Sequence, residues 1–322
     1  MRLRKFCPVF ALGTVLLFFG AASAQTIPPE FKAPVNLGSP INTSAVESDP
    51  FLTADGQKLF FTRDGDIWYA NRSGNSWVNA VKLNSQVNFP PSGVQSPSVS
   101  PDGQKLYFVV GARDGFFWDV WVSTWNSSTN DWGTPVNIGW PVNTPGAEFS
   151  VKLSPDGQRI YFSSNTSIPG TRCGFYVSQW TGSSWAIPQA VLIPGGECGL
   201  IEYPTITADG QWIYFDQFAS GGKSSFVSHW NGSAWEQAAE LRPQVGGRSA
   251  TPYITPSGDS LFLEGGPELG GGNGDIFLME RVVPQKIPTL NGKLLFLLTI
   301  LFAISGAMGL WKNVGNIRAK RV

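Results

Sequence analysis

The sequence has few of the residues that most often carry enzyme chemistry. Its 322 residues include one histidine and three cysteines. A Ser-His-Asp or Cys-His hydrolase would have to use His229, and no nucleophile motif such as G-x-S-x-G accompanies it. A tetrahedral zinc site would need more ligands than two distal cysteines and one histidine. We therefore expect no catalytic residues of these types, no metal and no cofactor, and favour a protein that is not an enzyme.

Charged residues are also scarce, at 14% of the chain, and they are unevenly distributed. Residues 25–283 hold 14 basic and 23 acidic side chains, whereas both ends of the chain carry only basic ones. So acidic a region repels a phosphate backbone, and nucleic acid is not an expected partner. The amino-acid composition gives no indication of a long soluble helix. Its 37 glycines, 24 prolines and 13% aromatic residues favour many short strands and turns.

One short motif recurs five times in the middle of the chain. The copies are ADGQKLFF (54–61), PDGQKLYF (101–108), PDGQRIYF (155–162), ADGQWIYF (208–215) and PSGDSLFL (256–263). Asp-Gly supplies a side-chain acceptor and a positive φ, and the residues after it favour a strand, so each copy predicts a tight turn followed by a strand. We interpret Asp55, Asp102, Asp156 and Asp209 as residues that cap these turns.

A second repeated segment completes the unit. It begins as FKAPVNLGSPIN (31–42) and returns, with decreasing similarity, at 77–88, 132–143, 185–194 and 235–245. The later four copies each follow a strand and a polar turn, which makes four strands per repeat of about 50 residues, the blade of a β-propeller. The first copy precedes every other strand and the last repeat has none after it. We therefore predict an all-β, five-bladed β-propeller over residues 31–283, closed by the N-terminal strand.

The repeats resemble those of a known family over nearly all of residues 45–283. The core S-P-D-G-Q, an aliphatic residue and two aromatics, followed by Gly-Asp-Ile-Trp-Tyr (65–69) and Gly-Asp-Ile-Phe-Leu (274–278), resembles the WD40-like propeller repeats of the TolB type. The resemblance implies a binding platform more readily than a reaction, because such propellers serve as scaffolds and surface proteins.

Both ends of the chain carry targeting patterns. Residues 1–24 combine a basic start, an apolar run and the ending Ala22-Ser23-Ala24, which predicts a secretory signal peptide. Residues 284–293 form a linker containing Ile287-Pro288-Thr289-Leu290, residues 294–311 an apolar transmembrane segment, and residues 312–322 a basic cytoplasmic tail. This tail resembles the IPTL-CTERM sorting signals, which implies a sorting peptidase as a partner; a plain C-terminal membrane anchor is the alternative. Both predict an exported protein, periplasmic or at the cell surface.

Export also permits a disulfide bond. In the propeller model, Cys173 lies in a loop of the third blade and Cys198 in the loop that leads into the fourth, and the two loop types emerge on the same face. We therefore predict that Cys173 and Cys198 are joined.

Functional residues are expected on the face where the loops are long and varied. The candidates for ligand binding are Glu47, Asp49, Glu148, Glu202, Arg248, Trp118 and Arg172. Carboxylates and aromatic rings on a concave face suit a glycan or a cation. We expect a protein or polysaccharide ligand on this face. The alternatives are a glycoside hydrolase that uses two or three of these carboxylates, and a surface protein without a small ligand.

Overall fold

The computed structural model describes residues 26–89, 93–111, 118–166, 174–195, 201–219, 222–269, 271 and 274–282. The predicted signal peptide, linker, transmembrane segment and basic tail lie outside these residues, as do Arg172, Cys173 and Cys198. Across the described part of the chain, no helix combines the length and the apolar character that crossing a membrane requires. The chain divides into two compact units, Met1–Arg281 and Val282–Val322, and every strand named below belongs to the first.

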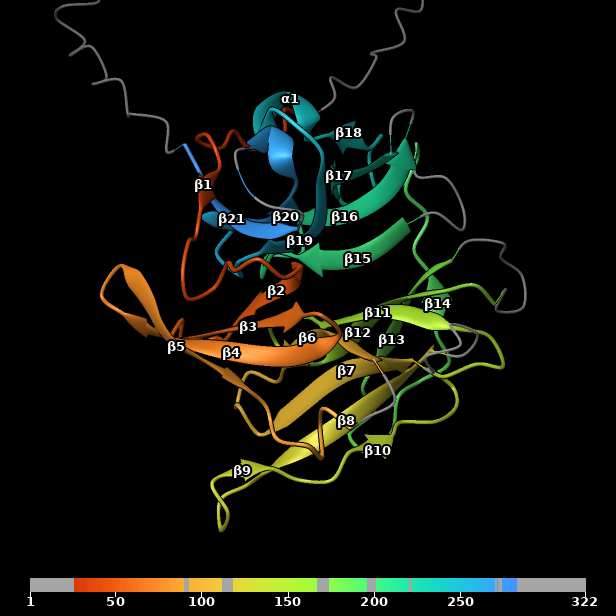
Figure 1. Ribbon diagram of the computed structural model, residues 1–322. Helices are drawn as coiled ribbons and strands as arrows, with labels where there is room; N and C mark the ends of the chain where they lie inside the picture. Colours follow the sequence, from red (N-terminus) through yellow and green to blue (C-terminus); the bar gives the residue numbers. More distant parts are fainter. Residues whose placement is uncertain are drawn as a thin grey trace, which may run out of the picture. The chain divides into compact units, whose positions relative to one another are not determined.

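The strands form five separate antiparallel sheets, one for each copy of the repeat (Figure 1). The first blade contains β2 (Glu47–Leu52), β3 (Lys58–Arg63), β4 (Asp66–Ser73) and β5 (Ser76–Lys82). The second contains β6 (Gly93–Val99), β7 (Lys105–Gly111), β8 (Trp118–Asn126), β9 (Asp131–Trp132) and β10 (Val136–Asn137). The third contains β11 (Glu148–Leu153), β12 (Arg159–Ser164), β13 (Phe175–Gln179) and β14 (Gln189–Ala190).

The fourth blade contains β15 (Ile201–Ile206), β16 (Trp212–Ala219), β17 (Gly222–His229) and β18 (Ala239–Glu240). The fifth contains β19 (Ser249–Ile254), β20 (Ser260–Gly265), β21 (Asp275–Glu280) and β1 (Val35–Asn36). Two single-turn helices, α1 (Arg242–Val245) and η1 (Pro267–Leu269), interrupt the connections. The predicted all-β, five-bladed β-propeller is confirmed.

The N-terminal segment closes the last blade, as predicted. β1 pairs antiparallel with β21, and Phe31 forms a further bridge with Arg281. The side chain of Phe31 is buried and its ring packs edge-on against Tyr214 of the fourth blade, with centroids 6.3 Å apart. Residues from the two ends of the propeller therefore share one sheet, which leaves no open edge at the seam.

The repeated aspartates cap their turns. Oδ1 of Asp55 accepts hydrogen bonds from Thr53 Oγ1 (2.6 Å) and the backbone N–H of Gln57 (3.0 Å), and Asp102, Asp156 and Asp209 repeat this arrangement. The Thr53 hydroxyl, followed by the Gln57 N–H, holds the pKa of Asp55 below its usual value. The capping interpretation is confirmed.

The recurrent tryptophans hold the blades together. Within the second blade, the rings of Trp125 and Trp132 meet edge-on at 5.3 Å. Trp132 is buried and packs on Phe60 of the first blade at 6.5 Å, just as Trp185 packs on Tyr107 across the next seam. Each contact brings a ring from one blade onto the almost continuously apolar second strand of the blade before it, which explains why the tryptophans repeat.

Candidate functional site

The innermost strand of each blade is bent in the same place. β2, β6, β11, β15 and β19 contact one another in a closed ring around the propeller axis, and each has a β-bulge near its start. At four of the bulges a residue other than glycine has a positive φ: Asp49 (53°), Ser96 (56°), Tyr203 (51°) and Thr251 (47°). A left-handed conformation is unfavourable for such residues, so the surrounding structure must stabilise it.

Hydrogen bonds between neighbouring blades supply that stabilisation. At every seam a backbone N–H of one inner strand donates to a side-chain oxygen of the blade before it. Around the axis, the bonds are Asp49 N to Thr251 Oγ1 (3.1 Å), Ser96 N to Asp49 Oδ2 (3.3 Å), Val151 N to Ser96 Oγ (3.1 Å), Tyr203 N to Ser150 Oγ (3.1 Å) and Thr251 N to Asp216 Oδ2. The five blades are thus joined by a closed ring of side chain to backbone hydrogen bonds, called the bulge ring below.

Asp49 belongs to this ring and is almost entirely buried, with 2% of its surface exposed. Its Oδ2 accepts from Thr62 Oγ1 (2.8 Å) as well as from Ser96 N. Its Oδ1 is buried and has no hydrogen-bond partner among the described residues. The carboxylate therefore joins two blades and is closed off from bulk solvent.

Two other predicted residues, Glu47 and Glu148, are likewise fully buried. Glu47 Oε1 accepts hydrogen bonds from Arg63 Nε (2.8 Å) and Thr43 Oγ1 (2.6 Å). Glu148 Oε1 accepts from Thr144 Oγ1 (2.7 Å) and Ser164 Oγ (2.8 Å), and burial raises the pKa of Glu148 to about 7. Both carboxyl groups fasten the loop before their strand to the strand beside it.

A more accessible group of charges surrounds Glu202. Lys223 Nζ donates to Glu202 Oε2 at 2.6 Å, and the two side chains are 27% and 23% exposed. The same ammonium group lies over the rings of Tyr203 (4.9 Å to the centroid) and Phe218 (5.3 Å). Phe218 is 48% exposed, so an aromatic surface lies beside the ion pair at the start of the inner strands. We call Glu202, Tyr203, Phe218, Lys223 and Glu264 the mouth cluster.

Glu264 and Asp216 are functional candidates that the sequence analysis missed. Burial raises the pKa of Glu264 to about 7, an effect that the carboxylate of Asp49 increases and Lys223 reduces. Burial also raises the pKa of Asp216 well above its ordinary value. Both follow the three apolar residues of a second strand, IYF in β16 and LFL in β20, and an acidic residue directly after such a run is the signal that could have identified them.

Lys223 is held in its charged form by these neighbours. Burial by itself lowers the pKa of Lys223, but the carboxyl groups of Asp216 and Glu202 outweigh burial, so the pKa lies above its usual value. A cation therefore stands among three acidic side chains at neutral pH.

Arg248 lies beside the mouth cluster, in an open groove of about 440 Å³. Its side chain is exposed, and its backbone N–H donates to Glu268 Oε1 at 3.0 Å. Lys223 and Glu264 line the same groove. Of the predicted residues, the structure therefore gathers Glu202 and Arg248 at one accessible place.

Trp118 does not join them. It is the first residue of β8 in the second blade, and its half-buried ring lies against the backbone of Gly111, where an added Cβ would come within 2.4 Å of the ring. The glycine makes room for the indole, which packs on the apolar cluster between the second and third blades. Arg172 lies outside the described residues.

The other end of the channel is closed by apolar side chains. Each inner strand contributes to this plug, in which only about 30 Å³ stays empty; its members include Phe51, Val99, Leu153, Ile206 and Ile254. Between the plug and the bulge ring lies Lys152, which is 2% exposed and donates from Nζ to the carbonyl oxygen of Pro97 at 2.8 Å. Burial lowers the pKa of Lys152 to about 8.

Comparison with solved structures agrees with a propeller fold. The chain is similar to a putative TolB from Agrobacterium tumefaciens (TM-score 0.47, 18% identity, 70% of this chain and 71% of that chain). It is also similar to a thermostable family-43 glycoside hydrolase (TM-score 0.53, 14% identity, 77% and 93% covered) and to an α-L-arabinofuranosidase from Podospora anserina in complex with cellotriose (TM-score 0.53, 11% identity, 80% and 98% covered). No protein-family model and no curated protein sequence matches the chain. At these identities the likeness concerns the fold alone.

Proposed function

We propose that this propeller is a non-enzymatic binding module that holds a polysaccharide at the mouth cluster. The observation that carries the proposal is the partly exposed ammonium group of Lys223, which is held 2.6 Å from Glu202 beside the exposed ring of Phe218. A sugar presents hydroxyl groups that donate and accept hydrogen bonds, together with an apolar face that stacks on an aromatic ring. The mouth cluster offers a complement for each.

A polysaccharide suits this surface better than a protein does. The cores of protein interfaces are apolar and depleted of charge. The groove beside Arg248 instead contains charged side chains of both signs: Lys223, Arg248, Glu264 and Glu268. Ligands with many hydroxyl groups match such a surface without leaving its charges unpaired.

The binding role is favoured over catalysis because of where the carboxyl groups lie. Glycoside hydrolysis needs two carboxyl groups that face the substrate from opposite sides. Glu47 and Glu148 are fully buried, and Asp49 is occupied in the bulge ring. The second candidate function is nevertheless a glycoside hydrolase, because a pKa of about 7 would suit Glu264 to the role of general acid.

The proposal places this binding outside the cytoplasm. The proposed location rests on the signal pattern of residues 1–24 and on the apolar and basic stretches of residues 294–322. In this proposal the C-terminal segment anchors the protein in a membrane, and a sorting peptidase acts at Ile287–Leu290.

A glycan panel with three variants tests the proposed function. The full chain is screened for binding, and the affinity for each glycan found is measured by calorimetry. Lys223→Met and Phe218→Ala should weaken binding at least about 10-fold, a change of about 1.4 kcal/mol. Lys82→Met is the matched control, because Lys82 forms an exposed ion pair of the same length, 2.6 Å, with Asp66 in the first blade.

Release of reducing ends from the same glycans separates the two functions. Binding without release supports the module. Release by the parent that disappears in Glu264→Gln overturns the non-enzymatic proposal in favour of the hydrolase. Equal affinity of Lys223→Met, Phe218→Ala and the parent would reject the mouth cluster as the site.

A further inference from the structure

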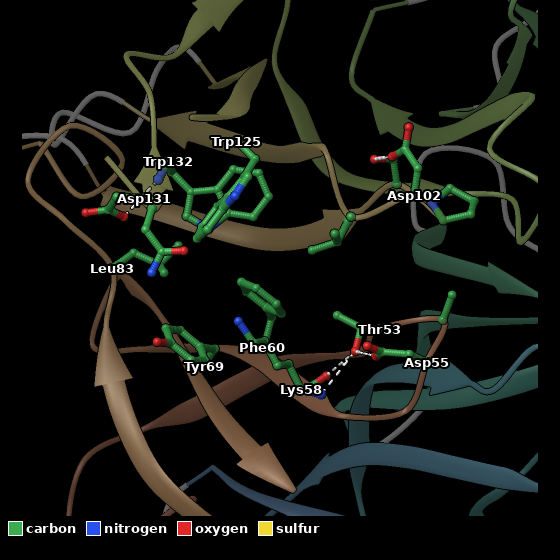
Figure 2. A pocket seen from close by; sticks show the side chains of 16 residues that line it. Thr53, Asp55, Lys58, Phe60, Tyr69, Leu83, Asp102, Trp125, Asp131 and Trp132 are labelled. Carbon is green, nitrogen blue, oxygen red and sulfur yellow. Dashed lines mark hydrogen bonds between the residues drawn. The ribbon is translucent and has the colours of Figure 1, made fainter. Parts of the chain in front are cut away.

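A second cavity lies at the opposite end of the blades, between the first and second. Its volume is about 270 Å³, and it is bordered by the turns around Asp55 and Asp102, where the inner strands end. Glu202, by contrast, lies at the start of its inner strand, β15. We call this cavity the seam pocket (Figure 2).

Aromatic rings from two blades face each other across the seam pocket. Figure 2 shows Phe60 and Tyr69 of the first blade on one side, and Trp125 and Trp132 of the second blade on the other. Phe60 and Trp132 are buried and belong to the core. Tyr69 and Trp125 are only half-buried, so each presents part of its ring to the cavity.

The ammonium group of Lys58 stands between these rings. Nζ lies 4.8 Å from the centroid of Tyr69 and 5.9 Å from that of Trp125. Among the described residues, the contacts of Nζ are these two ring contacts. Its three N–H donors are therefore available to a ligand.

Three carboxylates border the same space: Asp55, Asp102 and Asp131. In each, Oδ1 accepts the hydrogen bonds that cap a turn or a strand, such as the bond from Trp132 N to Asp131 Oδ1 at 2.8 Å. The second oxygen, Oδ2, has no such bond to the described residues. Hydrogen bonds from the Ser100 hydroxyl and the Gln104 N–H hold the pKa of Asp102 below its usual value, so this carboxylate is ionised at neutral pH.

We propose that the seam pocket binds one neutral sugar residue of a glycan. A sugar ring has an apolar face for Tyr69 and Trp125, acceptor hydroxyls for Lys58 and donor hydroxyls for the carboxylates. An organic cation is disfavoured because the ammonium group of Lys58, 4.8 Å from the centroid of Tyr69, repels it. An anion is disfavoured by the three carboxylates, and an apolar molecule would remove water from all four charges without replacing it.

The next seam offers an internal comparison. A cavity of about 280 Å³ between the second and third blades includes Lys105, whose Nζ lies 5.2 Å from the ring of Trp180. In the strand register, Phe60 pairs with Tyr69, whereas the equivalent Tyr107 pairs with Val122. The cavity between the second and third blades therefore lacks the ring that Tyr69 supplies to the seam pocket. We expect this cavity to bind the same sugar more weakly than the seam pocket does.

Methyl glycosides of glucose, galactose, mannose and N-acetylglucosamine test the proposal with the full chain. Binding is followed by saturation-transfer NMR and by tryptophan fluorescence. At least one glycoside should bind, and Lys58→Met and Tyr69→Val should each weaken it at least about 10-fold. Tyr69→Val places in the seam pocket the residue type that Val122 supplies at the equivalent position of the next seam. Lys105→Met is the matched control and should bind the glycoside like the parent.

The outcomes separate this site from the mouth cluster. Loss of binding in Lys58→Met, with Lys223→Met unaffected, supports the seam pocket whatever the fate of the proposed function. Loss in Lys223→Met alone overturns the inference, as does the absence of binding of all four glycosides to the parent. If Tyr69→Val unfolds at a lower temperature than the parent, Lys58→Met, which keeps most of the lysine stem, decides the result.

Discussion

The backbone N–H of Ser96 donates a hydrogen bond to Asp49 Oδ2 at 3.3 Å, although the two residues belong to different blades. They lie 47 positions apart, the distance between the first two copies of the turn motif, and both sit at the bulge of an inner strand with a positive φ. The bond is one of five that join neighbouring blades in the bulge ring. A single carboxylate thus links a local backbone bend to the assembly of the whole propeller.

Replacing Asp49 should therefore reduce stability. Asp49→Ala deprives the Thr62 hydroxyl and the Ser96 N–H of their acceptor inside the protein, which costs about 2–4 kcal/mol of unfolding free energy. Asp49→Asn keeps a side-chain acceptor, and asparagine tolerates the left-handed backbone. The free energy of unfolding of this variant should therefore fall by only about 1 kcal/mol. Urea denaturation of both variants measures the difference. Equal stability of Asp49→Ala and the parent would show that the bulge ring does not hold the blades together.

Removal of residues 25–40 should destabilise the entire propeller. The deletion takes away β1 with its pairing to β21, and the buried side chain of Phe31. Several backbone hydrogen bonds at about 1 kcal/mol each and about 2 kcal/mol for the phenylalanine are lost. Calorimetry should show the whole unfolding transition about 10–20 °C lower. Ile27→Ser, at a side chain that is 87% exposed, is the control, and an unchanged transition in the deletion would contradict closure by this strand.

Glu148 should make stability depend on pH. Its pKa is about 7 in the folded protein and about 4.5 when unfolded, so the folded state binds more protons between these values. The contribution of Glu148 to the free energy of unfolding is then intact below pH 4.5 and is lost as the pH rises towards 7. Glu148→Gln cannot ionise, so its stability relative to the parent should increase by about 3 kcal/mol from pH 4.5 to 8.

Denaturation at several pH values measures the effect of Glu148→Gln. The control is Glu280→Gln, because Lys32 holds the pKa of the exposed Glu280 below its usual value and its titration falls below this range. Stability curves for Glu148→Gln and the parent that stay parallel from pH 4.5 to 8 would refute the assigned role of burial.

The fold could be predicted from the sequence because its signals are local and repeated. Asp55 caps a turn through Thr53 and Gln57, its neighbours two positions away, and the strand that follows is apolar along its length. Five copies of such a unit also determine the number of blades. The copy of the second segment at residues 31–42, which precedes every other strand, determines how the ring closes. None of these inferences needs a distance between residues far apart in the chain.

The candidate site, by contrast, could be identified only from distances between residues far apart in the chain. Glu47 and Glu202 both lie near the start of an inner strand, but they differ by one position in register, because Glu47 pairs with Arg63 whereas Glu202 pairs with Asp216. Glu47 is sealed by Arg63, whereas Glu202 shares a partly exposed ion pair with Lys223. Glu264 was hidden in an apolar strand pattern. The sequence by itself determined the blades, their number and their closure, because backbone turns and strands respond to near neighbours. Only the tertiary structure decided which carboxyl groups reach solvent, because burial and pairing depend on side chains contributed by other strands and blades.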